Sequence, residues 1–245
     1  MRQTVYLLHG FAASARIWDE TKHYLGSEFD VVAPDWPGFG ERSAEAPLTS
    51  AEEMARFVVG LADAQGIERF HVVGHSMSGF VGQELLASHG ARIYRAVLYG
   101  AGARVDPARR FEPLQRTIER LHADGVPRTI ERVAKTWFCD GDKASAFQSC
   151  LASGRSMSLD AAVAAMRAFD ASDYRDRLCA VTHDVLVIMG ERDRTFPVEM
   201  GLELRDALPK GMLSVLPGCA HAAHLESPQL FNQIVGAFLS EGKVK

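Results

Sequence analysis

The fold expected for this chain is decided by the segment Val72-Val73-Gly74-His75-Ser76-Met77-Ser78-Gly79. Apolar residues typical of a strand end at Gly74, and a helical pattern begins directly after Ser76. A serine on so sharp a strand-to-helix turn projects its hydroxyl above the sheet. The backbone N–H of Met77, at the start of the helix, is then free to donate to an oxyanion.

The rest of the chain repeats this alternation of short apolar runs with helical patterns. Runs of this kind occur at 5–8, 29–33, 70–73, 96–99, 185–189 and 212–216. They are continuous rather than alternating, which is typical of strands that are buried on both faces. The pattern predicts an α/β fold with a mostly parallel sheet flanked by helices.

Residues 103–178 differ from the rest, because they contain helical patterns and no convincing strand. Apolar spacing predicts helices near 114–121, 130–137, 144–152 and 159–169. Long insertions are tolerated at protein surfaces and often carry function. We therefore expect a core of residues 1–102 and 179–245, with an all-helical lid at 103–178 inserted before the last two strands.

Composition excludes several functional classes. A net charge of −4 and the lack of long basic runs argue against nucleic acid as a partner. No apolar run approaches the roughly 18 residues that span a bilayer, and the first residues lack a signal-peptide pattern, so we expect a cytoplasmic protein without membrane contact. Four cysteines, at 139, 150, 179 and 219, have no metal-binding spacing and are expected to be buried thiols. The oligomeric state is not indicated.

Residues 72–79 resemble the nucleophile elbow of the α/β-hydrolase family, and the resemblance covers essentially the whole chain. One position departs from the family pattern: Ser78 stands where the family has its second elbow glycine, and Gly79 follows one place later. Serine is small enough for the close packing that this position requires. Some family members with this spelling are signalling receptors.

A serine hydroxyl needs a base to take its proton, and the base needs an orienting carboxylate. The resemblance implies the chain order serine, acid, histidine. Asp193, in the turn after the strand at 185–189, is the predicted acid. His221, after the final strand, is the predicted base.

Other residues compete for these two roles. Glu191 and Asp106 are the alternative acids, and His224 is the alternative base. We expect Glu191 to be a solvated loop charge. We expect His224 to be a structural neighbour of the site.

The second oxyanion donor and the pocket are also implied by resemblance. Leu8-His9-Gly10-Phe11-Ala12 matches the family's first-strand loop, so the Phe11 N–H joins that of Met77, and His9 is expected to bond the backbone nearby. Candidate pocket residues outside the lid are His75 and Trp36. The lid offers apolar candidates that can also pack against one another: Trp137, Phe138, Phe147, Met157, Met166 and Phe169.

These residues predict a serine hydrolase that acts on a small or medium carboxylic ester, or a thioester, through an acyl-enzyme on Ser76. No metal or organic cofactor is implied, and the expected partner is a small-molecule ester or acyl substrate. The same groups also occur in a slow-turnover ligand receptor of this fold. They occur equally in carbon–carbon bond hydrolases, lyases and cofactor-free oxygenases.

Overall fold

The computed structural model describes residues 2–109 and 111–241, and its core is one six-stranded sheet. The strands lie in the order β2-β1-β3-β4-β5-β6, and every pairing is parallel. All six predicted strands are present: β1 (Thr4–Leu8), β2 (Asp30–Val32), β3 (Phe70–His75), β4 (Ile93–Tyr99), β5 (Val185–Gly190) and β6 (Gly211–Leu216). The predicted α/β fold is therefore confirmed.

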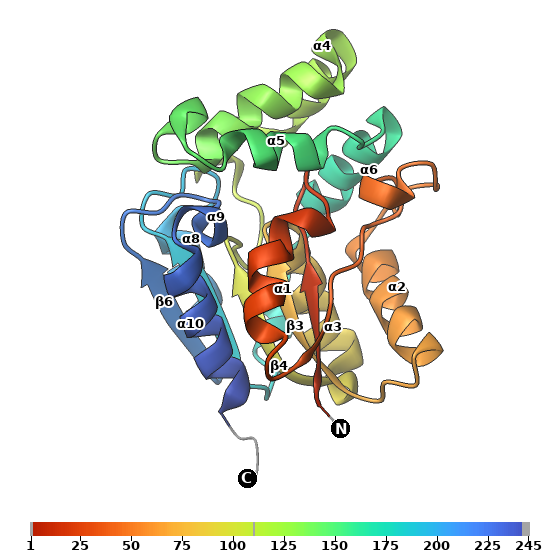
Figure 1. The fold of residues 1–245 in the computed structure, drawn as a ribbon, viewed down its shortest axis with the longest axis vertical. Coiled ribbons are helices and arrows are strands. Elements are labelled where there is room, and N and C mark those ends of the chain that lie inside the picture. The colour runs from red at the N-terminus through yellow and green to blue at the C-terminus, as the bar shows by residue number, and fades with distance from the viewer. Residues whose placement is uncertain (1, 110, 242–245) are drawn as a thin grey trace.

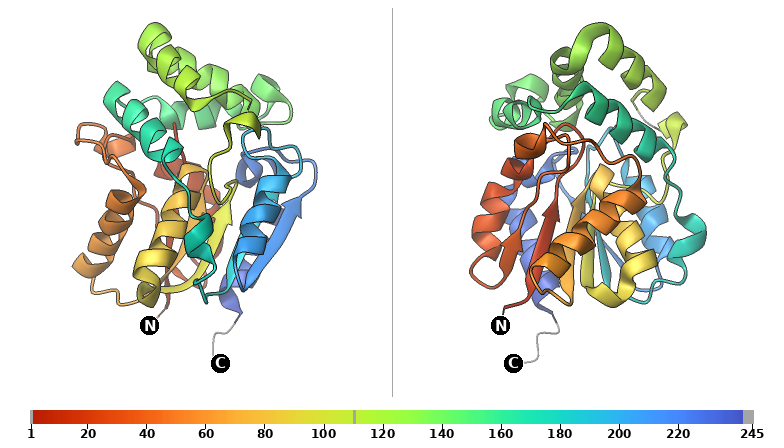
Figure 2. Two further views of the ribbon diagram at one scale, coloured as in Figure 1. Left: turned by 180° about the vertical axis from the view of Figure 1, so that it is seen from behind. Right: turned by 90° about the vertical axis from the view of Figure 1, so that its right-hand side faces the viewer.

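Helices cover both faces of the sheet (Figures 1 and 2). One face carries α1 (Asp19–Leu25) and α10 (Pro228–Ser240), and the other carries α2 (Ala51–Ala64), α3 (Met77–His89) and α8 (Val198–Ala207). Neighbouring strand residues enter different cores, as the two-residue period of a strand requires. Leu8 packs in the larger cluster with α2, α3 and α8, whereas Leu7 packs in the smaller cluster with α1 and α10.

Of the two helix N-termini that the sequence predicts from capping residues, α2 has the side-chain capping bond and α10 does not. At α2, the Ser50 hydroxyl accepts a hydrogen bond from the Glu53 N–H at 3.1 Å, and the Glu53 carboxylate accepts from the Thr49 N–H at 2.7 Å. This is close to the capping box that the sequence predicts. At α10, Pro228 occupies the first turn, but Ser227 makes no side-chain capping bond.

Between β4 and β5 the chain forms helices that lie above the carboxyl ends of the strands (Figure 1). They are α4 (Leu114–Ala134), α5 (Phe147–Gly154) and α6 (Leu159–Asp170). The short α7 (Arg175–Leu178) follows lower down, beside α3 and α8 (Figure 2). The sequence predicts two helices in the range that α4 covers, and the structure has a kink between them. Gly125, two residues before Pro127, has φ 81° at this kink. In a continuous helix the ring of Pro127 would clash with the carbonyl group four residues earlier, and proline has no N–H to bond it.

Two expectations about burial are wrong. Strands β2 and β6 are not buried on both faces, because each is an edge strand with a neighbour on one side only. Met212 and Val215 of β6 are each 38% exposed. Among the cysteines, Cys150 and Cys219 are buried, Cys139 is half-buried and Cys179 is exposed, and all four are free thiols. In the described part of the chain, every helix is too short or too polar to cross a membrane.

The junction of β3 and α3 has no room for a side chain on either of two glycines. A Cβ on Gly74 would lie 2.2 Å from the Ser78 carbonyl oxygen, and a Cβ on Gly79 would lie 2.4 Å from Ala101 Cβ. Both distances are far inside van der Waals contact. The glycines therefore allow the first turn of α3 to fold back against β3 and β4.

We expect Gly74→Ala to lower the free energy of unfolding by about 2 kcal/mol or more, because the new methyl group meets rigid backbone. Gly60→Ala is the matched control: Gly60 lies inside α2, and nothing lies within 4 Å of the Cβ it would gain. It should raise stability by about 0.5–1 kcal/mol, as alanine does in a helix. Urea unfolding followed by circular dichroism measures both changes, and equal values for the two variants would contradict this account of the junction.

Candidate active site

The predicted nucleophile lies on a strained turn at the carboxyl edge of the sheet. Ser76 connects β3 to α3 with φ 56° and ψ −116°, a region that side chains rarely adopt. Its N–H donates to the Tyr99 carbonyl oxygen at 2.7 Å, and its own carbonyl accepts from the Gly79 N–H at 2.8 Å. These bonds on both sides of the residue hold the turn.

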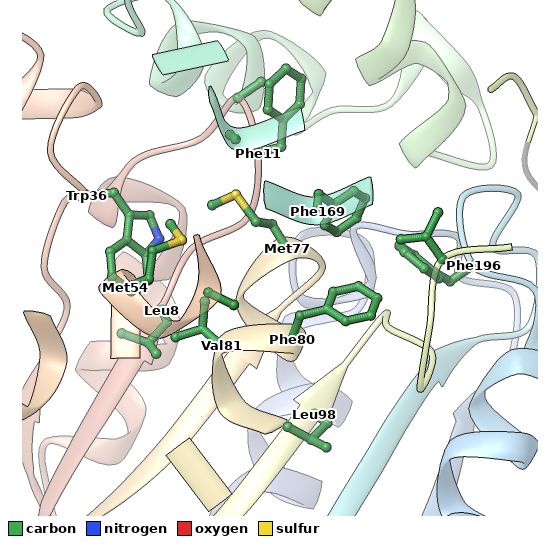
Figure 3. Packing of buried hydrophobic residues seen from close by; sticks show 14 of the residues in the cluster. Leu8, Phe11, Trp36, Met54, Met77, Phe80, Val81, Leu98, Phe169 and Phe196 are labelled. Atoms are coloured by element: carbon green, nitrogen blue, oxygen red, sulfur yellow. The ribbon is translucent and has the colours of Figure 1, made fainter. Parts of the chain in front are cut away.

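The predicted oxyanion loop approaches this turn closely. A Cβ on Gly10, just after β1, would lie 3.0 Å from Ser76 Cβ. Among the described residues, Ala12 and Ser76 are the two non-glycine residues with positive φ, and both flank the predicted oxyanion donors. Met77 is the first residue of α3, so its N–H has no acceptor within the helix. Phe11 lies above Met77 (Figure 3).

The predicted acid and base form a buried hydrogen bond. His221 Nδ1 lies 2.7 Å from Asp193 Oδ2, and the two side chains are at most 1% exposed. The other carboxylate oxygen, Asp193 Oδ1, accepts from the backbone N–H groups of Thr195 at 2.7 Å and Phe196 at 3.0 Å. A hydrogen bond from Nδ1–H to a carboxylate leaves Nε2 of the imidazole as the proton acceptor.

The residues that compete for the acid and base roles make hydrogen bonds with other groups. Glu191 accepts from the Gly218 N–H at 2.8 Å, which braces the loop after β6. Asp106 accepts from Arg104 at 2.9 Å and lies 3.5 Å from Arg109. His224 is buried beside His75, with 5.0 Å between the two ring centroids, and its ring lies 4.8 Å from that of Trp18.

The sequence analysis missed the groups that hold the backbone at His221. The Tyr99 hydroxyl donates to the His221 carbonyl oxygen at 2.7 Å, and His75 Nε2 donates to the same oxygen at 3.1 Å. Glu226 accepts from the backbone N–H groups of Cys139 at 2.7 Å and Ala220 at 2.6 Å, so it ties the helical segment to this loop. Only the Asp-x-Thr turn after β5 has a sequence signal, since aspartate often bonds backbone two residues on.

Three buried histidines around the site are held neutral. Burial lowers the pKa of His9 to about 4. Burial, together with the charge that His221 would carry, lowers the pKa of His75 well below its usual value and that of His224 to about 3. His9 makes the expected backbone contacts: Nδ1 donates to the Gly10 carbonyl at 2.9 Å, and Nε2 accepts from the Trp36 N–H at 3.3 Å.

Ser78, the departure from the family pattern, connects the elbow to the oxyanion loop. Its hydroxyl donates to the His9 carbonyl oxygen at 2.5 Å and accepts from Trp36 Nε1 at 3.2 Å. Trp36 Nε1 also lies 3.1 Å from the same carbonyl oxygen. With glycine at position 78, the His9 carbonyl oxygen, in the loop that leads to Phe11, would have one hydrogen bond fewer.

Two small cavities meet at Ser76, and each has room for about one water. Cavity A, of about 20 Å³, is mostly apolar and is lined by Phe11, Ser76, Phe111, Thr117, Val133, Trp137, Met166, Phe169 and Thr195. Cavity B, of about 10 Å³, contains the imidazoles and is lined by Phe11, Ala13, Ile17, His75, Ser76, Trp137, Cys150, His221, Ala222, His224 and Leu225. Ser76 and His221 therefore share cavity B.

The predicted pocket residues divide between these cavities and the core. His75, Trp137, Met166 and Phe169 line cavity A or cavity B. The other four candidates take the packing alternative that the sequence left open, and each is buried without lining either cavity: Trp36, Phe138, Phe147 and Met157. Trp36 lies beside Met54, away from Phe11 (Figure 3), and Phe138 packs edge-on against Phe147 at 6.0 Å. An apolar residue in a helical pattern can face either way, so the pattern could not separate lining from packing.

Both cavities lack formal charges on their described lining residues, which include no Lys, Arg, Asp or Glu. Within residues 2–109 and 111–241, no three side chains of His, Cys, Asp or Glu gather as a metal site would require.

Comparison with known proteins identifies the family to which the chain belongs. Residues 5–234 match the model of the alpha/beta hydrolase family, so the chain belongs to that family of enzymes. It is 28% identical to a 2-hydroxy-6-oxononadienedioate/2-hydroxy-6-oxononatrienedioate hydrolase of Paraburkholderia phymatum, over 98% of this chain and 88% of that protein.

Solved structures of the same fold are close in shape. An enol-lactonase from Burkholderia xenovorans LB400 has a TM-score of 0.91 at 24% identity, covering 98% of this chain and 92% of that chain. A thermophilic esterase from Thermogutta terrifontis has a TM-score of 0.88 at 25% identity, covering 97% and 89%.

We expect the protein to lose stability between about pH 7 and pH 5. His9, His75 and His224 have folded pKa values below the unfolded value of about 6.5, so in this window the unfolded chain binds protons that the folded chain does not. Each group should contribute up to about 2 kcal/mol at pH 5. Urea unfolding at the two pH values measures the difference, and His224→Gln should make the dependence shallower. Equal stability at both pH values would contradict the neutral assignment.

We expect Ser78→Ala to lower the free energy of unfolding by about 1–2 kcal/mol, because the His9 carbonyl loses a buried donor and the Trp36 indole loses an acceptor. The control is Ser27→Ala, whose hydroxyl donates to a carbonyl at an exposed position. That change should stay within about 0.5 kcal/mol. Unfolding in urea compares the two variants; equal losses would mean that the Ser78 bonds add nothing.

Proposed function

We propose that the protein is a serine hydrolase that cleaves a small or medium carboxylic ester, or a thioester, through an acyl-enzyme on Ser76. One observation carries the proposal. Asp193 and His221 form a buried 2.7 Å hydrogen bond, and His221 shares a cavity with a serine held on a strained elbow. This arrangement supports acyl transfer, because each group has the environment that its step requires.

In the first half of the reaction, Ser76 Oγ attacks the ester carbonyl while His221 Nε2 takes the hydroxyl proton. Asp193 holds the imidazole tautomer and stabilises the imidazolium. The N–H groups of Phe11 and Met77 bind the oxygen that becomes negative. When the carbon–oxygen bond breaks, His221 returns the proton to the departing alcohol.

In the second half, a water molecule takes the place of the alcohol. His221 accepts a proton from this water as it attacks the acyl-enzyme, and then gives a proton to Ser76 Oγ as the acid departs. No metal or organic cofactor takes part in this proposal.

The cavities favour an uncharged group on each side of the reacting bond. A carboxylate or ammonium buried there would need a partner of opposite charge, and none of the described lining residues supplies one. Residues 103–178 act in this proposal as a lid, with Trp137 and Met166 contributing the walls above Ser76. Location in the cytoplasm stays a prediction of the sequence.

The second candidate is a carbon–carbon bond hydrolase. It is favoured by the similarity to the Paraburkholderia phymatum hydrolase, whose substrate is named as a dienedioate and so carries two carboxylates. Neither cavity at Ser76 has a charged lining residue that would pair with these carboxylates, whereas Arg16 lines the larger cavity beside them. Hydrolysis of p-nitrophenyl butyrate and of a hydroxy-oxo-dienedioate, measured side by side, decides between the two.

We expect Ser76→Ala to abolish both labelling by a fluorophosphonate probe and turnover of p-nitrophenyl butyrate. His221→Ala and Asp193→Asn should each lower kcat at least about 10³-fold, because one removes the base and the other favours the wrong tautomer. His224→Ala is the matched comparison and should cause a much smaller loss, since His224 contacts Tyr99 rather than Asp193. Steady-state kinetics measures all four variants.

Three results would contradict the proposal. Stoichiometric labelling of the Ser76→Ala variant would remove Ser76 from the nucleophile role. A larger loss at His224 than at His221 would reverse the two assignments. A single stoichiometric burst of nitrophenol without further turnover would indicate a receptor rather than an enzyme.

A further inference from the structure

Two histidines that line cavity B, His75 and His224, each have one ring nitrogen with no hydrogen-bond partner among the described residues. The first is Nδ1 of His75. His75 Nε2 must carry the proton, because its partner is the His221 carbonyl oxygen at 3.1 Å, which can only accept. Nδ1 of this neutral ring is therefore a bare acceptor, and it lies 3.2 Å from where a Cβ on Gly10 would be.

The second is Nε2 of His224, and its state follows from Tyr99. The Tyr99 hydroxyl uses its only hydrogen on the His221 carbonyl oxygen at 2.7 Å. His224 Nδ1, at 3.2 Å from that hydroxyl oxygen, must therefore donate to it. This leaves Nε2 of His224 as a second bare acceptor on a residue that lines cavity B.

Both rings are buried, with His75 6% and His224 3% exposed, and both stay neutral. A buried acceptor without a partner destabilises the site, so such groups normally bind a water or a ligand. Cavity B has room for about one water in the free protein. A hydroxyl group of a substrate can displace that water and reproduce its bond.

Cavity B is also the side of Ser76 on which the alcohol must leave. His221 gives its proton to the departing oxygen, and it lines cavity B but not cavity A. The acyl part would then face cavity A, where Phe111, Val133 and Met166 must move apart to admit it, because that cavity has room for about one water.

A third cavity lies beside cavity B. Cavity C, of about 270 Å³, shares Ile17, Cys150 and Leu225 with cavity B, so these side chains stand between the two. Its other lining residues are more polar, and they include Arg16, Asp19, Ser149 and Ser153. A larger cavity of about 590 Å³ adjoins cavity C and shares Arg16, Ala152 and Ser153 with it. An alcohol in cavity B would pass the shared side chains, between Ala15–Trp18 and α5, to reach these polar surroundings.

We propose that the substrate is the ester of an apolar acid with a polyol, in which a hydroxyl group beside the ester oxygen donates to His75 Nδ1 or His224 Nε2. The rest of the polyol extends past Cys150 into cavity C. This inference rests on the proposed ester hydrolysis and specifies its leaving group. The ester carbon–oxygen bond breaks, the proton from Ser76 passes through His221 to the polyol oxygen, and water later releases the acid.

Glycerol monobutyrate and propyl butyrate test this inference, because they share the acyl chain and differ in the two hydroxyl groups of the alcohol. We expect wild-type kcat/KM to be about tenfold or more higher for the glycerol ester, since a buried acceptor gains its missing donor. In His75→Phe and in His224→Phe the ratio of the two kcat/KM values should fall toward one. Equal wild-type values would overturn the inference.

Two further variants test which cavity holds the alcohol and which holds the acyl group. Cys150→Phe narrows the passage from cavity B to cavity C, so it should lower kcat/KM for glycerol monobutyrate more than for ethyl butyrate. The Cys150→Phe measurement still tests the inference if the two histidine variants do not fold. Val133→Ala, in cavity A, is the matched control: it should shift the preferred acyl chain length and leave the glycerol-to-propyl ratio unchanged. If the glycerol-to-propyl ratio changes in Val133→Ala but not in Cys150→Phe, the alcohol lies in cavity A rather than cavity B, and the inference is wrong.

Failure of the proposed function gives a different result from failure of this inference. If p-nitrophenyl butyrate is hydrolysed and depends on Ser76, but the glycerol and propyl esters react equally, ester hydrolysis stands and the polyol assignment is wrong. If none of the three esters is hydrolysed, both proposals are wrong.

Discussion

The site depends on a single backbone constraint, the positive φ of Ser76. A side chain at φ 56° is unfavourable by about 1–3 kcal/mol unless its surroundings impose it. Here they do: the Ser76 N–H is bound to the Tyr99 carbonyl, and Gly74 and Gly79 let α3 pack directly against β3 and β4. The turn aims the hydroxyl away from the sheet and toward the helices above it.

A parallel sheet brings the other groups to the same edge. β2 pairs with one side of β1 and β3 pairs with the other, so the strand order reverses at β1. Ligands in open α/β sheets bind at such a reversal. The loop after β1 therefore meets Ser76, while the loops after β5 and β6 supply Asp193 and His221. Burial keeps His9, His75 and His224 neutral, so the carboxylate partner distinguishes His221 from its neighbours.

Several expectations failed for the same reason. The runs at 29–33 and 212–216 read as fully buried strands, yet β2 and β6 are partly exposed, since strand order is a property of the whole sheet. For Trp36 and Phe138 the sequence left open whether they line the pocket or pack, and they pack in the core, because hydrophobicity does not reveal which neighbour a side chain meets. Thr117 and Leu225, which do line cavities, have no distinguishing local signal.

The sequence by itself determined the strands and the elbow at Ser76, while its resemblance to the α/β-hydrolase family pointed to the turns after two strands for the candidate partners at 193 and 221. These features are local: apolar periodicity, glycine spacing and the turn after each strand are all written in short segments. Only the tertiary structure decided which histidine contacts the carboxylate, which nitrogen of His75 and His224 carries the proton, and which cavities lie side by side between Met166 and Arg16. Those properties come from contacts between different elements, 28 residues apart for Asp193 and His221 and more than a hundred for the bonds of His75 and His224, and no local pattern encodes them.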